Sequence, residues 1–261
     1  MKKPPPYPEG HQLLKGKTVL VTAAAGTGIG NAVARRCAEE GASALVIADI
    51  HERRLGEAAN GIEAQTGLRP HTIVADVTSE EDVQRMFAFA IEKMGHIDVL
   101  MNNAGLGGYA RVREMTDEQW SKVLDVSLNG CFRCLRAAMN HMVPRGTGSI
   151  VNNASVLGWR AQEGQAHYAA AKAGVMALTR CAAIEAAEES SVRINCVAPT
   201  LAKHPFLAKV TPPGLLEALE AKEAFGRGAE PFEIANVMVF LASDLASYMT
   251  GETLSISSQR A

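Results

Sequence analysis

The chain has 261 residues, of which 47% are hydrophobic and 21% charged, and its formal net charge is −2. A chain of this length can bury a core that needs neither disulfides nor a metal ion, and the composition is that of an ordinary globular domain. The near-neutral charge argues against a nucleic-acid partner and against a polybasic membrane anchor. No apolar run approaches the roughly 18 residues of a membrane span, so no membrane partner is expected.

Residues 1–16 are rich in proline and polar side chains, and they lack the apolar stretch of a signal peptide. We expect a flexible segment, or one draped over the surface, ahead of a single domain at 17–261 in a cytoplasmic protein. The five cysteines are scattered and favour reduced core thiols. Cys131 and Cys134 form a C-x-x-C inside a predicted helix, where packing is the preferred interpretation and no metal site is expected.

From residue 17 onward, short apolar strands alternate with helices. The pattern predicts strands at 18–23, 44–49, 71–76, 97–105, 149–155, 192–199 and 252–257. It predicts helices at 29–41, 52–67, 79–95, 116–142, 167–189 and 231–244. Such alternation indicates right-handed βαβ units, and therefore an α/β domain with one doubly wound parallel sheet and helices on both faces. The stretch 200–230 shows no strong periodicity, and we expect it to form a substrate lid.

The turn after the first predicted strand is rich in glycine and other small residues. In a parallel α/β sheet, ligands bind outside the carboxyl ends of the strands. Small residues there let backbone N–H groups reach a pyrophosphate at the N-terminus of the next helix. A plain tight turn is the alternative, but the position between an apolar strand and a helix favours phosphate binding. The residues concerned are Ala24, Gly26, Thr27, Gly28, Ile29 and Gly30.

Asp49 ends the second predicted strand, about 20 residues after Gly30. A carboxylate there can accept both hydroxyls of an adenosine ribose and repels a 2′-phosphate, so the sequence favours NAD over NADP. Arg53 and Arg54 keep NADP open, although a solvated helix face is the preferred interpretation for both.

Two further strand ends border the same crevice. Asp76, at the end of the third strand, can receive the adenine amino group or serve as an ordinary turn acid. The fourth strand ends in Asn102, Asn103, Ala104 and Gly105. Their small size lets the backbone approach a cofactor, while the asparagines can instead tie the sheet together by hydrogen bonds.

Tyr168 and Lys172 place a phenol and an ammonium four residues apart on one helix face. Ser155, at the end of the fifth strand, precedes them by a loop long enough to return the chain beside Tyr168. A free tyrosine has a pKa near about 10, and a neighbouring ammonium or a positive nicotinamide favours the phenolate. Tyr168 can then exchange a proton with an alcohol or ketone while a cofactor carries the hydride. Lys172 can also hold the nicotinamide ribose, and Ser155 can hydrogen bond the reacting oxygen.

Taken together and in this order, TAAAGTGIG, NNAG, Ser155, YAAAK and FLASDLASYMTGETL resemble the short-chain dehydrogenase/reductase family over about residues 14–258. The resemblance implies a Rossmann-like fold with a seven-stranded parallel sheet and a nicotinamide cofactor. It also implies a homotetramer built through helices 116–142 and 167–189 and the last strand. By position, Ser155, Tyr168 and Lys172 take the catalytic roles just derived, and Val77 and Pro199 join the expected cofactor contacts.

The sequence departs from the family pattern at several points. Ala24 replaces the first motif glycine and fits a tight turn if its φ stays negative. Ser127 aligns with the family's catalytic helix asparagine and can hold a water in a proton relay, whereas Asn129 points elsewhere. His204 replaces a threonine, and it is either a cofactor or substrate contact or an ordinary lid histidine. Ser257-Ser258-Gln259 replaces the usual Asp-Gly-Gly.

The stretch between Ser155 and Tyr168 borders the substrate in this family, and it contains Trp159, Arg160, Gln162 and Gln165. Trp159 can meet a flat apolar surface and Arg160 an anionic group, or both can merely seal the loop. NASVLGWRAQ and HYAAAKAGVMALTRC are similar to an actinobacterial branch that degrades sterol rings as hydrindane carboxyl-CoA thioesters. That similarity implies a bulky alicyclic acyl-CoA substrate. A 3-oxoacyl-thioester reductase, a polyol dehydrogenase and a non-catalytic NAD-binding regulator are the alternatives.

Overall fold

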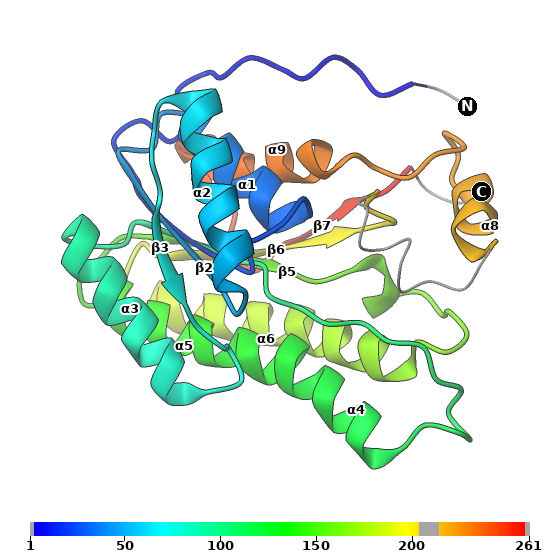
Figure 1. Cartoon of the computed structure of the whole chain (residues 1–261). Coiled ribbons are helices and arrows are strands. Elements are labelled where there is room, and N and C mark those ends of the chain that lie inside the picture. The colour runs from blue at the N-terminus through cyan, green and yellow to red at the C-terminus, as the bar shows by residue number, and fades with distance from the viewer. Residues whose placement is uncertain (1–2, 204–213, 259–261) are drawn as a thin grey trace.

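The structure is a computed structural model, and it describes residues 3–203 and 214–258. Seven strands form one sheet, with helices on both of its faces (Figure 1). The strands are β1 (Thr18–Thr22), β2 (Ala44–Asp49), β3 (His71–Val74), β4 (Val99–Asn102), β5 (Ser149–Asn153), β6 (Arg193–Pro199) and β7 (Thr253–Ile256). Their order is β3-β2-β1-β4-β5-β6-β7, and every neighbouring pair is parallel. The predicted doubly wound, seven-stranded Rossmann-like sheet is therefore confirmed.

Alternation along the strands divides the core into two layers. In β1, Val19 and Val21 pack with helices on one face, whereas Leu20 packs with helices on the other. The first layer holds α1 (Ile29–Glu39), α2 (Glu52–Thr66) and α9 (Pro231–Ala242). The second layer holds α3 (Glu80–Met94), α4 (Asp117–Leu124), α5 (Gly130–Met142) and α6 (Ala166–Glu189), as Figure 1 shows. Because both faces are covered, the central strand β1 is buried along its whole length, whereas three of the four residues of β3, at the edge of the sheet, are exposed.

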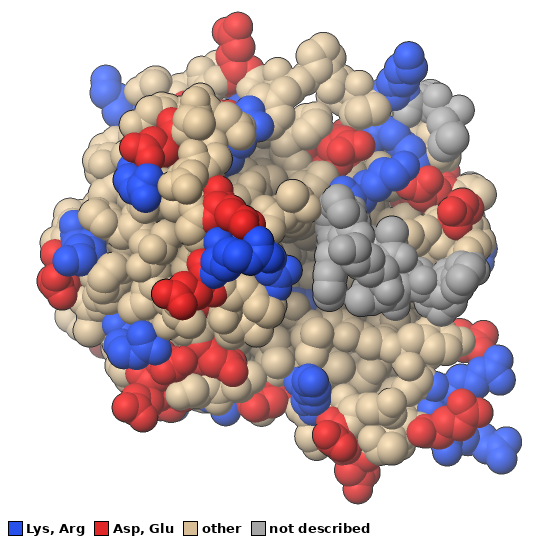
Figure 2. Space-filling view, viewed as in Figure 1, with Lys and Arg blue, Asp and Glu red and all other residues tan. Residues whose placement is uncertain are grey.

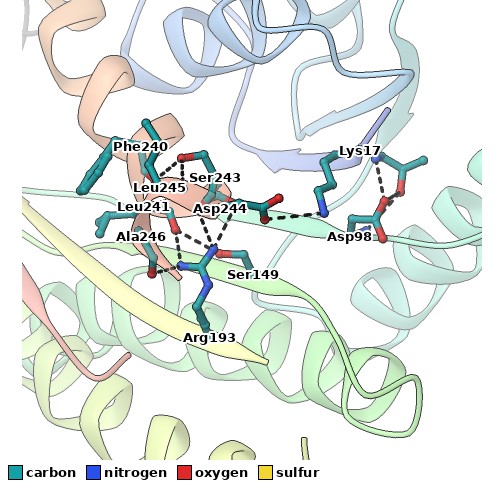
Figure 3. A network of polar contacts seen from close by, with 12 residues as sticks. Lys17, Asp98, Ser149, Arg193, Phe240, Leu241, Ser243, Asp244, Leu245 and Ala246 are labelled. Atoms are coloured by element: carbon teal, nitrogen blue, oxygen red, sulfur yellow. Dashed lines mark hydrogen bonds and ion pairs between the residues drawn. The ribbon is translucent and has the colours of Figure 1, made fainter. Parts of the chain in front are cut away.

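The amino edge of the sheet is held by a structural network (Figure 3). Arg193, the first residue of β6, donates hydrogen bonds to four backbone oxygens at and beyond the end of α9, those of Leu241, Ala242, Ser243 and Ala246. A guanidinium suits this place because the last carbonyls of a helix lack partners and carry partial negative charge. Nearby, the backbone N–H of Thr18 donates to Asp98. The opposite, carboxyl edge remains for binding and chemistry.

Part of the N-terminal segment lies against α1. Tyr7 donates to Glu39, and the guanidinium of Arg36 donates to the backbone oxygens of Pro8 and Glu9. Glu40 is fully buried, pairs with Arg36 at 2.5 Å and accepts two backbone N–H groups of the segment, those of His11 and Leu13. Through these contacts the segment packs on α1 and on Glu40 at the end of that helix.

Two predicted elements differ from the structure. The helix expected at 116–142 is interrupted by a π-helical turn, η1 (Asp125–Asn129), in which the N–H of Gly130 donates to the oxygen of Asp125. Apolar spacing cannot reveal one inserted residue in a turn, and such turns often occur at functional sites. The stretch 200–230, expected to be irregular, contains α8 (Leu215–Lys222), and a β-bridge joins Ala202 to Ala229.

Charges of both signs are intermixed on the face shown in Figure 2, in keeping with the net charge of −2. Within the described residues, no helix combines the length and the apolar character that crossing a membrane requires.

Candidate active site

The turn between β1 and α1 has the features of a phosphate cradle. Gly28 precedes α1 as its N-cap without a side-chain cap, and the first turn of the helix carries no acid. A Cβ added to Gly26 or Gly28 would meet nothing within 4 Å, and Thr27 between them is exposed. Unpaired N–H groups at a helix start, beside open space, suit an anion. The residues present therefore fit a dinucleotide pyrophosphate.

The turn reaches its tight geometry at Ala23. Ala23 has a φ of +53°, in the left-handed region that disfavours side chains, whereas buried Ala24 is not among the positive-φ residues. Ala24 therefore has the negative φ that the sequence analysis required of it. The sequence did not indicate that Ala23 would take the positive φ instead. Gly30 packs onto this turn so closely that a Cβ would lie 2.1 Å from the Ala23 oxygen. Helix α1 thus contacts the turn directly.

Asp49, the last residue of β2, faces this turn. One carboxylate oxygen accepts from the N–H of Ala25 at 3.0 Å, and the other accepts from the N–H of His51 at 3.1 Å. Burial raises the pKa of Asp49, while the N–H groups of Ala25 and Ile50 and the charge of Arg54 act in the opposite direction. The Asp49 side chain is half-buried, at the carboxyl end of β2 next to the turn that precedes α1.

The end of β3 is organised by local contacts. One oxygen of Asp76 accepts from both the N–H and the hydroxyl of Thr78, so this acid does stabilise its own turn. Val77 is buried against α5, and a Cβ on Gly130 would lie 2.7 Å from the Val77 side chain. The glycine at 130 therefore allows the helix to approach the strand end.

A chain of amides joins the carboxyl ends of β1, β4 and β5. The amide of Asn153 donates to Asn103 at 2.8 Å, and the amide of Asn103 donates to the backbone oxygens of Thr22 and Ala23. The N–H groups of Asn103 and Ala104 donate to the Thr22 hydroxyl. These asparagines tie the sheet together, which was the alternative interpretation from the sequence. Their side chains fix the positions of the strand ends that border the crevice.

Lys172 continues this chain from α6. Its ammonium donates to the backbone oxygen of Asn153 at 2.6 Å, and it lies 5.5 Å from the ring centroid of Tyr168. Ser155 follows β5 by two residues, is 8% exposed, and accepts the N–H of Leu157 at the start of the short 3₁₀ turn η2 (Val156–Gly158). Tyr168 is half-buried. The structure thus joins the predicted phenol and ammonium and places both beside the end of the strand that precedes Ser155.

A glycine-rich loop after β4 packs against these groups. A Cβ on Gly105 would lie 3.0 Å from the Lys172 nitrogen, and one on Gly107 would lie 3.9 Å from the Tyr168 ring. Ser127, fully buried in η1, donates to the oxygen of Leu106 and accepts its N–H, both at 2.9 Å. Because the hydroxyl hydrogen is used, Ser127 can serve a water relay here only as an acceptor. Asn129 instead bonds to Asp125 on the surface.

His167 was not indicated as a site residue by the sequence. It is 1% exposed, its Nδ1 accepts the N–H of Tyr168 at 2.9 Å, and a Cβ on Gly108 would lie 3.1 Å from its Nε2. Burial lowers the pKa of His167, which favours the neutral ring that this hydrogen bond requires. An unpaired N–H in the first turn of α6 is thereby satisfied. In the sequence, only the position of His167 immediately before Tyr168 could have indicated this role.

The residues expected to border the substrate differ in exposure and in their hydrogen-bond partners. Trp159 is 54% exposed, and the amide of Gln165 donates to the backbone oxygen of Gly108. Arg160 donates to the hydroxyl of Ser257 at 3.3 Å. Pro199 is buried and pairs with Ile256. His204 lies outside the described residues.

Ser258, which stands at the first glycine of the usual Asp-Gly-Gly, has a hydrogen-bond partner. Buried Glu223 follows α8 and accepts from the hydroxyls of Thr200 at 2.6 Å and Ser258 at 3.0 Å. The N–H of Lys203 donates to the oxygen of Ala229. These bonds fasten both described ends of the 200–230 stretch to the carboxyl edge of the sheet.

Cys131 and Cys134 are free and buried in α5, and no disulfide is formed. Burial raises the pKa of the Cys131 thiol to about 12 and that of Cys134 further still, which makes both poor nucleophiles and poor ligands at neutral pH. Within residues 3–203 and 214–258, no cluster of histidine, cysteine or acidic residues is arranged to hold a metal ion.

Comparison with known proteins agrees with this geometry. A family model described as "Enoyl-(Acyl carrier protein) reductase" matches residues 23–258. The chain is 58% identical to the (5R,7aS)-5-hydroxy-7a-methyl-1-oxo-2,3,5,6,7,7a-hexahydro-1H-indene-carboxyl-CoA reductase of Mycobacterium tuberculosis, over 96% of this chain and 95% of the relative. It is 38% identical to the cis-4-hydroxycyclohexanecarboxylate dehydrogenase of Sinomonas cyclohexanicum, over 91% and 94%.

A solved short-chain dehydrogenase of Mycobacterium smegmatis superposes with a TM-score of 0.87 at 54% identity, and the match covers 99% of both chains. An NAD⁺-bound xylitol dehydrogenase superposes with a TM-score of 0.88 at 32% identity, over 94% of this chain and 99% of the other. The shared fold, the family model and these relatives lead to one conclusion: the chain belongs to the short-chain dehydrogenase/reductase family of nicotinamide-dependent oxidoreductases, which act on CH–OH groups.

Proposed function

We propose that this oxidoreductase uses NAD to interconvert a secondary alcohol and a ketone on a bulky alicyclic acyl-CoA. The observation that carries the proposal is the placement of Lys172 within 5.5 Å of the Tyr168 ring, anchored to the end of β5. This pairing of a phenol and an ammonium supports proton transfer at the edge where parallel α/β sheets bind ligands, and Ser155 follows the same strand by two residues.

In the proposed mechanism Tyr168 is the acid and base. It gives its hydroxyl proton to the ketone oxygen in reduction and takes the proton of the alcohol in oxidation. The charge of the buried Lys172 ammonium, 5.5 Å from the Tyr168 ring, stabilises the negative charge that develops during proton transfer, and Ser155 donates a hydrogen bond to the reacting oxygen. When bound, a nicotinamide dinucleotide supplies or accepts the hydride. Ser127 supports the loop over Lys172, with a water relay as its proposed second role.

The preference for NAD rests on Asp49. Its carboxylate is held by two backbone N–H groups beside the cradle formed by residues 26–30. A fixed negative charge there accepts ribose hydroxyls and repels a 2′-phosphate. Arg53 is occupied by an ion pair with Glu57 on the surface of α2, which supports its interpretation as a solvated residue.

The substrate class is supported by two relatives whose names specify an alicyclic acid or its CoA ester. Exposed Trp159 beside Arg160 provides an apolar surface next to a cation. The stretch 200–230, fastened at both described ends, is the proposed lid. The chain is also 37% identical to the 3-oxoacyl-(acyl-carrier-protein) reductase FabG of Thermotoga maritima. A straight-chain 3-oxoacyl thioester is therefore the second candidate substrate class.

The test is a steady-state assay of nicotinamide absorbance with NAD(H) and NADP(H). The panel contains alicyclic hydroxyacyl-CoA thioesters, acetoacetyl-CoA and xylitol. We expect the highest kcat/KM for an alicyclic thioester with NAD(H). A preference for acetoacetyl-CoA would assign the straight-chain function. Nucleotide binding without any turnover would indicate a regulator instead.

We also propose assembly into a homotetramer through the α4–α6 face. Ile184 on α6 is 66% exposed, and Phe132 on α5 and Trp120 on α4 are also exposed. Large apolar side chains grouped on the helices of one layer are typical of surfaces buried between copies. Analytical ultracentrifugation tests this arrangement, and Ile184→Glu should shift the sedimentation profile towards smaller species.

A further inference from the structure

Arg160 carries a guanidinium that the protein leaves partly unsatisfied. Its Nη2 donates to the hydroxyl of Ser257 at 3.3 Å, whereas its Nη1 is buried and has no hydrogen-bond partner. Among the described residues, no carboxylate forms an ion pair with Arg160. A buried donor on a charged group is costly to leave unpaired, so its partner is expected to arrive with a ligand.

Other buried polar atoms without partners are of a different kind. Arg36 and Arg227 each leave only Nε unpaired, and both guanidinium groups already bind glutamates. The remaining ones are amide oxygens and a hydroxyl. Within residues 3–203 and 214–258, Arg160 thus differs from Arg36 and Arg227, because the atom it leaves buried without a partner is a terminal nitrogen, Nη1.

The position of Arg160 places this nitrogen beside the candidate active site. Its backbone N–H donates to the oxygen of Val156, in the turn that begins immediately after Ser155. Its partner Ser257 follows Ile256, which pairs with Pro199 at the end of β6. The side chain therefore extends from the end of β5 to the end of β7 along the carboxyl edge.

We propose that Arg160 is a specificity-determining residue that binds an acyl oxygen of the substrate, either a carboxylate oxygen or a thioester carbonyl oxygen. This inference rests on the proposed function and names the part of the substrate that the residue recognises. In a hydroxycyclohexanecarboxylate the ring carries no acceptor besides the reacting oxygen, so the acyl group offers the other strong acceptor. A guanidinium provides two parallel donors for a carboxylate, and one of them suffices for a carbonyl.

The first experiment compares wild type with Arg160→Gln and Arg160→Lys. Four alcohols are assayed: cis-4-hydroxycyclohexanecarboxylate, its CoA thioester, its N-acetylcysteamine thioester, and 4-methylcyclohexanol, which lacks an acyl group. We expect Arg160→Gln to lose roughly tenfold to a hundredfold in kcat/KM on the three acyl-bearing alcohols, with 4-methylcyclohexanol unchanged. Arg160→Lys should recover part of the loss. Arg69→Gln is the matched control, because exposed Arg69 pairs with Glu63 at the end of α2.

The pattern of losses decides the assignment. A loss confined to the CoA thioester would show a contact with CoA phosphates and would overturn the inference. An equal loss on all four alcohols would indicate a structural role, and no loss would leave Arg160 without a function in binding. Thermal unfolding of each variant verifies that the fold is kept.

A second measurement is independent of turnover. Titration calorimetry of cyclohexanecarboxylate into the NAD⁺-saturated protein should give a dissociation constant at least about tenfold lower for wild type than for Arg160→Gln. Equal affinities would contradict the role of Arg160. If wild type turns over no member of the panel but shows this difference, the proposed reaction fails while the acyl-binding site stands.

Discussion

The ammonium of Lys172 on α6 lies 2.6 Å from the backbone oxygen of Asn153 at the end of β5, and the side chain is only 2% exposed. A buried ammonium is costly unless it is paired, so this contact fixes both its position and the distance to Tyr168. The amide of Asn153 in turn bonds to Asn103, which holds the turn after β1. One continuous hydrogen-bonded chain therefore connects Lys172 to the turn after β1, which leads into the proposed cofactor cradle.

Lys172→Met should reduce turnover by roughly 10²-fold or more, because the positive charge beside the Tyr168 ring, which stabilises negative charge developing in the transition state, is lost. The backbone oxygen of Asn153 also loses its partner, so the melting temperature should fall. Rates are measured with the preferred substrate of the panel, and Lys122→Met on exposed α4 serves as the control. A variant with near wild-type kcat would show that the ammonium has no part in the reaction.

Two glycines in the same turn should respond differently to alanine. At Gly30 a Cβ would clash with the Ala23 oxygen and lie 2.6 Å from the amide nitrogen of Asn103, so Gly30→Ala should lower the free energy of unfolding by about 1–3 kcal/mol or more. At Gly28 the space is empty and φ is −86°, so Gly28→Ala should fold normally. It should nevertheless bind NAD more weakly, since that space is assigned to the pyrophosphate. Urea denaturation and nucleotide titration separate the two effects. Unchanged NAD affinity in Gly28→Ala would remove the cradle from this turn.

Asp49→Ala should raise the ratio of kcat/KM for NADP to that for NAD by roughly tenfold to a hundredfold, because an ionised acceptor for the ribose is removed and the 2′-phosphate is no longer repelled. The ratio is obtained by varying each nucleotide at saturating substrate. Glu57→Ala, which removes an exposed carboxylate from α2, is the matched control. If the ratio stays constant in Asp49→Ala, another group holds the ribose.

The lowered pKa of buried His167 predicts a pH-dependent stability. Below its ordinary pKa of about 6.5, the unfolded chain binds a proton that the folded chain does not, so the free energy of unfolding falls as the pH drops towards the folded-state pKa. In His167→Asn, the amide oxygen can accept the Tyr168 N–H without titrating. Urea denaturation at pH 7 and pH 5 should therefore show a smaller decrease for His167→Asn than for wild type. His71→Asn, at an exposed position of β3, should behave as wild type. A decrease of the same size in His167→Asn would contradict this account.

The sequence predicted the sheet and its two helix layers because apolar strands and amphipathic helices carry strong periodic signals. Tyr168 and Lys172 could be paired because four residues along a helix place side chains on one face. The contact between Lys172 and Asn153 depends on how α6 packs against β5, which no local pattern specifies. The π-helical turn at Asp125–Asn129, the positive φ of Ala23 and the His167 hydrogen bond depend likewise on single backbone positions. Ser257 and Ser258 appeared only as departures from a pattern, and their partners Arg160 and Glu223 lie far from them in sequence.

The most direct measurement is the rate of hydride transfer in Tyr168→Phe, followed in a single turnover of the NAD(H)-loaded protein with its best substrate. Phenylalanine keeps the ring beside Lys172 and removes only the hydroxyl that carries the proton. We predict a rate lower by roughly 10²–10⁴-fold while the dissociation constant for NAD stays within about twofold of wild type. A rate equal to that of wild type would contradict the assignment of Tyr168 as the proton donor and acceptor.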